Sequence, residues 1–215
     1  MRRLLLARHG QSESNAVRRF QGVQDVPLSE LGHRQAEALG EALTRRRIAA
    51  IYASPLQRAR RTAEIVAGAT GAPLHEIEDL RELSLGEWEG CTVEEVRTRP
   101  GDPYSCWVRD PVGGMPPGGE PLAEVQARVL RAIAAIEGAH PNGDDVLVVC
   151  HGGVISAYLA HCLALPLSSI WRLTLSNGSI SEVAPPRVLT MNDTTHLARV
   201  SAPPRGFHPL SPLSP

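Results

Sequence analysis

The run Val146-Leu147-Val148-Val149 restricts the fold most strongly, because it has the composition of a strand buried on both faces of a sheet. Turn residues bound this run, with Asn142-Gly143 before it and Gly152-Gly153 after it. The pattern predicts a strand over residues 145–150 and a helix over residues 153–163. Other strands are expected at residues 3–7, 48–53 and 73–77, with two or three more between residues 172 and 191.

Helical patterns separate the predicted strands. Residues 29–47 place apolar side chains on one face and end in a basic turn, which suits the helix dipole. Ser54-Pro55 predicts a second helix start, with Ser54 as the N-cap and a helix running to about residue 69. Residues 120–137 have helical spacing as well. Strands that alternate with helices predict an α/β fold: a three-layer α/β/α sandwich around a mostly parallel central sheet.

The length of 215 residues suits one domain, which we expect over residues 1–202. Residues 91–121 interrupt the alternation, and we expect a lid-like excursion there. It would begin with a short helix at residues 91–99 and continue through a segment rich in Gly and Pro. Residues 203–215 form a Pro-rich tail that we expect to be disordered.

Composition excludes several functional classes. A formal net charge of −1 gives no global basic field, so we expect no nucleic-acid partner. No apolar stretch reaches membrane-spanning length, and Arg8-His9 interrupts the N-terminal apolar run too early for a signal peptide. We therefore expect a soluble, cytoplasmic protein without a membrane partner. The four cysteines and eight histidines show no metal-ligand spacing, so we expect no metal and no cofactor.

Cationic and imidazole side chains follow three of the predicted strands. Arg8-His9-Gly10 comes after the first strand, Arg58 lies just beyond the second, and His151-Gly152 comes after the late strand. Parallel sheets bind ligands at the carboxyl ends of their strands, so we expect these segments to meet. Arg matches phosphate oxygens, a Gly-rich helix N-terminus offers free N–H groups, and neutral imidazole is a nucleophile. The sequence therefore predicts a phosphate site.

Five sequence blocks occur in order along nearly the whole chain except the tail. They are Arg8-His9-Gly10-Gln11-Ser12, Ser54 to Ala63, Leu80 to Gly90 with Glu82 inside it, Gly118-Gly119-Glu120, and His151-Gly152-Gly153. The ordered set resembles the histidine phosphatase superfamily, in its phosphoglycerate mutase-like part. Residues 177–180 and 189–197 resemble the α-ribazole phosphatase and broad-specificity branch. Pro121 departs from the pattern, because relatives commonly carry Ser there, and this puts the pocket edge in doubt.

The resemblance implies a role for each matching residue. His9 would be the phosphorylated nucleophile, and Glu82 would protonate the leaving alcohol and later activate water. The residues alone do not select Glu82, which lies in a segment dense in acids. Arg8, Arg58 and His151 would hold the phosphoryl oxygens. Asn15 and the Gly152 N–H would be further phosphate donors, while Gln21 and Gly22 would face the substrate or the nucleophile.

This assignment predicts a metal-independent phosphoric monoester hydrolase of the histidine acid phosphatase type, acting on a small phosphorylated metabolite. The arginines, with His151 protonated beside the anion, would supply the positive charge that a metal supplies elsewhere. We also expect the Gly10 backbone or a nearby carbonyl to accept a hydrogen bond from one nitrogen of His9, which leaves the other nitrogen free for attack.

Alternatives stay open at this point. A cofactor-dependent phosphoglycerate mutase would share the catalytic blocks, although mutases carry a longer insertion where residues 91–117 are comparatively short. A non-catalytic protein that binds phosphorylated ligands or proteins is a further alternative. The substrate is open among α-ribazole 5′-phosphate, sugar phosphates, phosphoglycerate esters and phosphoserine. Arg18 and Arg19 could bind a second anionic group or form a solvated stretch, and a homodimer is also possible.

Overall fold

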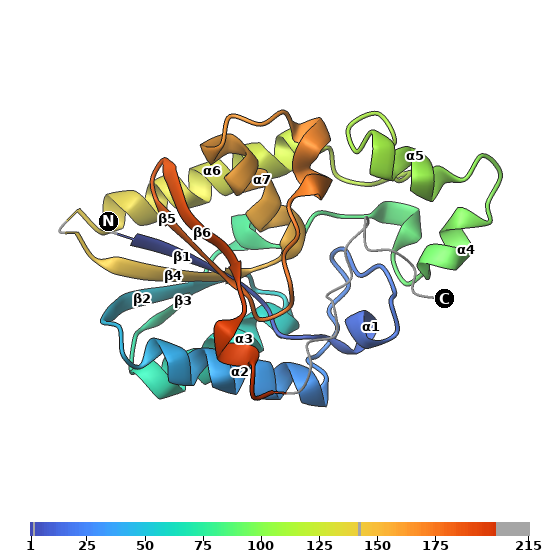
Figure 1. The fold of residues 1–215 in the computed structure, drawn as a ribbon. Coiled ribbons are helices and arrows are strands. Elements are labelled where there is room, and N and C mark those ends of the chain that lie inside the picture. The colour runs from blue at the N-terminus through green and yellow to red at the C-terminus, as the bar shows by residue number, and fades with distance from the viewer. Residues whose placement is uncertain (2, 142, 201–215) are drawn as a thin grey trace.

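A six-stranded sheet forms the centre of the protein, in the order β3-β2-β4-β1-β5-β6 (Figure 1). The structure is a computed structural model that describes residues 1, 3–141 and 143–200. The four strands β1–β4 pair in parallel, while β5 and β6 extend the sheet as an antiparallel edge. The bounds are β1 Arg3–Arg8, β2 Ile48–Ala53, β3 Leu74–Glu76, β4 Asp145–Cys150, β5 Ile180–Ala184 and β6 Arg187–Asp193.

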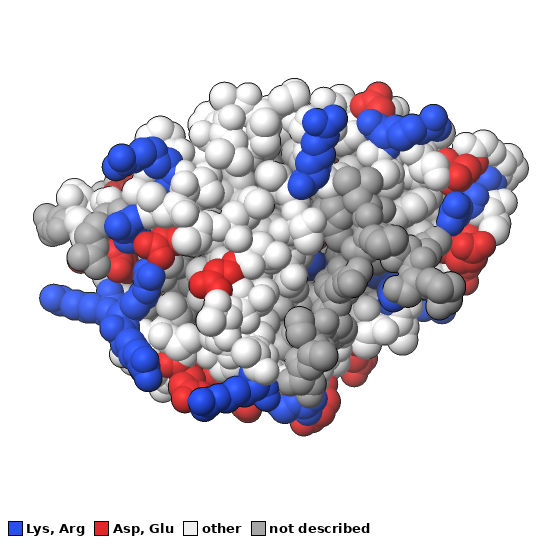
Figure 2. Space-filling model, in the orientation of Figure 1, with Lys and Arg blue, Asp and Glu red and all other residues white. Residues whose placement is uncertain are grey.

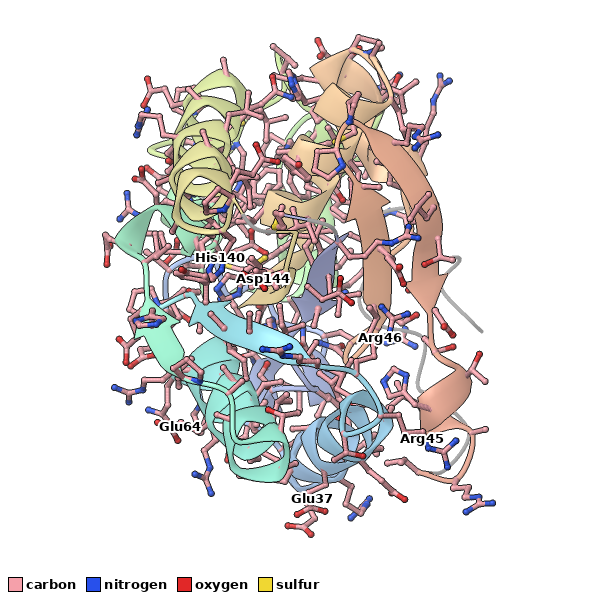
Figure 3. The ribbon with its side chains drawn as sticks, turned by 90° about the vertical axis from the view of Figure 1, so that its left-hand side faces the viewer. Glu37, Arg45, Arg46, Glu64, His140 and Asp144 are labelled. Atoms are coloured by element: carbon pink, nitrogen blue, oxygen red, sulfur yellow. The ribbon has the colours of Figure 1, made fainter. Side chains whose placement is uncertain are left out.

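Helices cover both faces of the sheet, which confirms the predicted α/β architecture. Figure 1 shows α6 and α7 on one side, and α2 and α3 on the other. Figure 3 shows the same layers from the left-hand side of that view, with α6 in yellow and with α2 and α3 in blue and turquoise. The bounds are α1 Glu13–Ala16, α2 Glu30–Leu43, α3 Gln57–Thr70, α4 Val93–Arg97, α5 Pro103–Arg109, α6 Leu122–Ala139 and α7 Gly152–Cys162, with short 3₁₀ turns at Glu78–Leu80, Gly86–Trp88, Leu167–Arg172 and Thr195–Leu197.

The alternation of side chains along the central strands divides the core in two. Leu4 and Leu6 of β1 pack with α6 and α7, whereas Leu5 and Ala7 pack with α2 and α3. β4 divides in the same way, and all six of its residues are buried. This burial on both faces explains why β4 reads as a continuous apolar run in the sequence.

Two boundaries differ from the sequence predictions. The predicted N-cap at Ser54 is wrong: the helix begins at Gln57 after Leu56, which is extended and makes no side-chain cap bond. The Ser54 hydroxyl instead lies 2.7 Å from His151 Nε2, so a tertiary contact replaces the local cap. The late strands begin at Ile180, later than the predicted residue 172, because residues 167–172 form a 3₁₀ turn. Two strands follow, β5 and β6.

Residues 91–121 lie beyond the carboxyl ends of the parallel strands and include α4 and α5, on the right of Figure 1. Backbone hydrogen bonds join the two ends of this segment. Glu87 N donates to Pro117 O at 3.0 Å, and Glu120 N donates to Ser84 O at 2.9 Å. We call these two contacts the neck of the excursion. Its movement as a lid and the single-domain boundary at residue 202 stay predictions.

The predicted disorder of residues 203–215 lies outside the described residues. Within the described part of the chain, no helix combines the length and apolar character that crossing a membrane requires. Acidic and basic side chains are interspersed on the face shown in Figure 2. Cytoplasmic location, homodimerisation and the lack of a nucleic-acid partner stay predictions.

Candidate active site

The carboxyl ends of β1, β2 and β4 bring the predicted site residues to one pocket. The register pairs Ala7 of β1 and Ala53 of β2 with Val149 of β4, so the three strands end at the same level. Eight of the nine predicted residues line this pocket: Arg8, His9, Asn15, Gln21, Gly22, Arg58, Glu82 and Gly152. The ninth, His151, packs its ring against that of His9, with 5.1 Å between the ring centroids.

His9 is oriented by backbone contacts. Its Nδ1 lies 2.6 Å from the Gly10 carbonyl oxygen, as expected, and a carbonyl can only accept. Nδ1 therefore carries the proton, and Nε2 keeps a free lone pair. The His9 backbone is also fixed, since its N–H donates to Cys150 O at 3.0 Å and its carbonyl accepts from Gly178 N.

The environment keeps His9 uncharged. Its side chain is buried, and burial is the main cause that holds its pKa well below the usual range for histidine. The guanidinium groups of Arg58 and Arg8 lower the pKa of His9 further. Burial lowers the pKa of each arginine to about 10, so both remain charged at neutral pH. The site thus combines a neutral imidazole with two buried cations.

His151 is buried beside the two arginines and His9. Burial first, and then Arg58, His9 and Arg8, hold the pKa of His151 well below its usual range, and its protonation beside a bound phosphate stays a prediction. Ser54 Oγ accepts from Leu56 N at 3.3 Å, so its hydroxyl proton is free to donate to His151 Nε2 at 2.7 Å. With Ser54 as the donor, the proton of the neutral ring is on Nδ1, which has no partner among the described residues. A neutral His151 can therefore still donate a hydrogen bond.

Backbone carbonyl oxygens hold the two arginines in place, and each arginine keeps an N–H group without a partner among the described residues. Arg58 donates from Nη1 to Gln24 O and from Nη2 to Gly22 O, both at 2.8 Å. Arg8 donates from Nη1 to Leu175 O. The Nε atoms of Arg8 and Arg58 are buried without a partner among the described residues. Because buried N–H groups are nearly always paired, these donors favour an anion in the pocket.

Uncharged donors complete the anion site. Asn15 Oδ1 accepts from Ser12 N at 3.2 Å and from Asn177 Nδ2 at 3.0 Å, which leaves the Asn15 amide N–H groups for other partners. Gln21 Oε1 accepts from Ser12 Oγ at 2.7 Å, with the same consequence. Gly152 is the first residue of α7, where backbone N–H groups have no partner within the helix and favour anions.

Glu82 lines the same pocket from a different segment. Its Oε1 accepts from Leu83 N at 3.0 Å, and its Oε2 accepts from Gly153 N at 3.3 Å. A Cβ at residue 153 would lie 2.7 Å from Glu82 Oε1, so glycine there leaves room for the carboxylate. This places an acid and base candidate beside the N-terminus of α7.

An ion pair between the buried Arg128 and the half-buried Glu120, which the sequence analysis missed, fixes the Glu82 segment. Arg128 Nε lies 2.7 Å from Glu120 Oε1, and Arg128 Nη1 donates to Asp79 O at 2.8 Å and Arg81 O at 2.6 Å. Glu120 in turn accepts from Ser84 N at 3.4 Å. Contacts therefore bracket Glu82 on both sides. The available signal was a charged residue among the buried apolar positions of α6.

Other positioning residues were also missed as site residues. Thr62 Oγ1 accepts from Gly10 N at 3.1 Å and donates to Arg58 O at 2.8 Å, so it links the two predicted segments. Gly32 packs directly against this loop: a Cβ on Gly10 would lie 2.4 Å from Gly32 O. Among the described residues, no group of three His, Cys, Asp or Glu side chains is arranged to hold a metal ion.

Comparisons with known proteins agree with this geometry. The family model described as histidine phosphatase superfamily (branch 1) matches residues 4–190. Phosphoserine phosphatase 1 of Hydrogenobacter thermophilus is 35% identical, over 92% of this chain and 95% of that protein. The adenosylcobalamin/alpha-ribazole phosphatase of Salmonella typhimurium is 31% identical, over 84% of this chain and 89% of that protein.

A solved structure shares the fold. Bacillus stearothermophilus YhfR superposes with a TM-score of 0.84 at 36% identity, covering 91% of this chain and 98% of that one. Phosphoglycerate mutase-like relatives also occur. The family resemblance inferred from the sequence blocks is confirmed. The chain belongs to the histidine phosphatase superfamily, branch 1.

Proposed function

We propose that the protein hydrolyses small phosphomonoesters through a phosphohistidine intermediate on His9. One observation carries the proposal: the bond from Nδ1 to the Gly10 carbonyl leaves Nε2 of a neutral His9 free in a pocket that holds two buried arginines. The names of the phosphatase relatives support the same reaction class.

In the first step, His9 Nε2 attacks phosphorus and the bond from phosphorus to the ester oxygen breaks. Glu82 gives its proton to the leaving oxygen, so an alcohol departs rather than an alkoxide. Such general acid catalysis contributes about 10²–10⁴-fold. The His9 Nδ1 proton stays bonded to Gly10 O. Arg8, Arg58, Asn15 and the Gly152 N–H would hold the phosphoryl oxygens.

In the second step, water attacks phosphorus and the P–N bond breaks. Glu82, now a carboxylate, takes the proton from water, and inorganic phosphate leaves with His9 restored to its neutral form. The step needs no charged His151, because its Nδ1–H can donate while the ring is neutral. Two arginines provide the positive charge, so we propose a reaction that is independent of metal, of the histidine acid phosphatase type.

Trapping the intermediate tests the proposal. Wild-type protein mixed with ³²P-labelled phenyl phosphate and quenched in denaturant should retain label that mild acid releases. His9→Ala should lose both label and turnover, while the exposed His161→Ala should keep them. Label retained in His9→Ala would refute the assignment, and failure to hydrolyse any aryl phosphate would favour a non-catalytic binding protein. Turnover unchanged after extensive chelation is expected, and its loss would refute metal independence.

A mutase is the second candidate, because phosphoglycerate mutase-like relatives occur. A mutase must keep its phosphoenzyme from water, whereas residues 91–121 form a short excursion that supplies one described residue, Trp107, to the pocket wall. This arrangement favours hydrolysis. Incubation with 3-phosphoglycerate, with and without 2,3-bisphosphoglycerate, separates the candidates: a phosphatase releases free phosphate, and a mutase forms 2-phosphoglycerate.

A further inference from the structure

Asn177 carries a buried amide that lies between the loop of the nucleophile and α1. It precedes β5, and only 3% of it is exposed. Its Nδ2 donates to His9 O at 3.2 Å and to Asn15 Oδ1 at 3.0 Å, and it lies 3.5 Å from Gly10 O. One side chain therefore contacts both the backbone that carries the nucleophile and a proposed phosphate donor.

Backbone groups decide which way the two amides point. The carbonyl oxygens of His9 and Gly10 can only accept, so Asn177 presents its NH₂ group to them. The Ser12 N–H can only donate, so the Asn15 atom 3.2 Å from it is the amide oxygen. Asn15 Oδ1 therefore accepts from both Ser12 and Asn177, and the Asn15 NH₂ group, on the other arm of the amide, is free to face the pocket that Asn15 lines.

The distance between the Asn15 amide and His9 needs a link of this kind. Asn15 lies in α1, which has four residues, and so short a helix has little rigidity of its own. The bond from Ser12 to Asn15 lies within the cap of that helix, so it orients the amide without joining it to His9. Asn177 joins the two from a third segment, which is itself held because Gly178 N donates to His9 O at 3.1 Å.

We propose that Asn177 is a positioning residue of the reaction: its bridge from the His9 backbone to the Asn15 amide keeps the Asn15 NH₂ group on a phosphoryl oxygen while that phosphorus faces His9 Nε2. This inference rests on the proposed phosphatase function. Asn177 lies outside the described pocket lining, so it acts through Asn15 and does not touch the substrate. Displacement of a positioned group by about 1 Å can cost about 10²-fold in rate, so the link matters for turnover.

Two substitutions remove the bridge. Asn177→Ala deletes the donor and leaves space, whereas Asn177→Leu fills that space with an apolar group, so that no water can donate to Asn15 in its place. In both variants we expect kcat/KM to fall about 10- to 100-fold. The loss should be equal for phenyl phosphate and glycerol 2-phosphate, because both react at the same phosphoryl group. Inhibition by orthovanadate, which mimics that group, should weaken by a similar factor.

A double-mutant cycle with Asn15→Ala tests whether Asn177 acts through Asn15. If Asn15→Ala alone lowers kcat/KM about 10²-fold, as loss of an oxyanion donor does, independent effects would make the double variant at least about 10³-fold slower than wild type. We expect Asn15→Ala/Asn177→Ala to lie within about 3-fold of Asn15→Ala, because the bridge has nothing left to position. A general loosening of the fold would multiply the two losses and would not produce this coupling.

Ser181→Ala is the matched control. Ser181 is a buried polar residue of β5, and its Oγ accepts from Asn192 N of β6 at 3.1 Å, so the variant loses a hydrogen bond between these strands. It should keep the wild-type kcat/KM per folded molecule, with the folded fraction measured by circular dichroism.

Three outcomes would overturn the proposal. They are wild-type kcat/KM in both Asn177 variants, a loss confined to the alkyl substrate, and losses that multiply in the double variant. Each leaves phosphohistidine trapping on His9 of the wild-type protein intact and so spares the proposed function. Absence of both turnover and trapping in wild type would instead refute the proposed function, and this inference with it.

Discussion

Acid should destabilise this protein through His9 and His151 in particular. Both side chains are buried, and both have pKa values held well below the usual range, mainly by burial. In the unfolded chain each would titrate near pH 6.5. Below that pH the unfolded state binds more protons than the folded state, so the free energy of unfolding falls as pH falls. The contribution is lost on the acid side of about pH 6.5.

The size of the effect follows from linkage. A histidine that stays neutral in the fold costs nearly 1.4 kcal/mol per pH unit once the pH is well below its unfolded pKa. Integration from pH 7.0 to pH 5.5 gives a loss of about 1 kcal/mol for each histidine, and about 2–3 kcal/mol for the pair. That is a large fraction of the total stability of an ordinary domain, about 5–15 kcal/mol.

Urea unfolding followed by circular dichroism measures this loss. The free energy of unfolding is determined at pH 7.0, 6.5, 6.0 and 5.5, in phosphate-free buffers of constant ionic strength, because bound phosphate would stabilise the fold. The His9→Asn/His151→Asn double variant should lose about 2–3 kcal/mol less than wild type over this range. The exposed His161→Asn serves as control. Parallel pH dependence in wild type and double variant would refute the reasoning.

The remaining predictions concern catalysis. Arg58→Ala should lower kcat about 10²–10³-fold on aryl phosphates, as loss of an oxyanion donor does, and a near-wild-type kcat would remove Arg58 from the site. Glu82→Gln should slow alkyl phosphates far more than aryl phosphates, whose leaving groups need less protonation, and equal slowing would contradict the acid role. Arg128→Met should cost about 1–3 kcal/mol by urea unfolding, because it removes the partner of the half-buried Glu120 carboxylate. It should also shift the alkyl-to-aryl rate ratio in the direction of Glu82→Gln, and an unchanged ratio would mean that Arg128 does not position the acid.

Periodicity was sufficient to predict the layers and the meeting point of the site. Short apolar runs identified the buried strands, and the general behaviour of parallel sheets placed Arg8, His9, Arg58 and His151 at one edge. These inferences succeed because strand burial and strand polarity are local properties of the sequence. The Ser54 prediction was wrong because a hydroxyl that suits an N-cap also suits a buried histidine, and the tertiary partner decided.

The remainder of the site depends on long-range contacts. Glu82 came from family resemblance, and its supports lie 38 and 46 residues further along the chain, at Glu120 and Arg128. No local pattern marks such a pair beyond a charge on an apolar helix face. Trp107 and Trp171 were not among the predicted site residues. Only the folded structure shows that both residues line the pocket.

The neck of the excursion separates the segment that shapes the pocket wall from the residues that position the Glu82 carboxylate. Backbone bonds from Glu87 to Pro117 and from Glu120 to Ser84 fix where the intervening chain begins and ends, whatever it contains. Insertions, deletions or exchanges between these points can therefore reshape the wall at Trp107 without displacing the carboxylate of Glu82. Related proteins with a common ancestor can therefore differ in substrate through changes in this segment. The residues that carry out the phosphoryl chemistry stay the same.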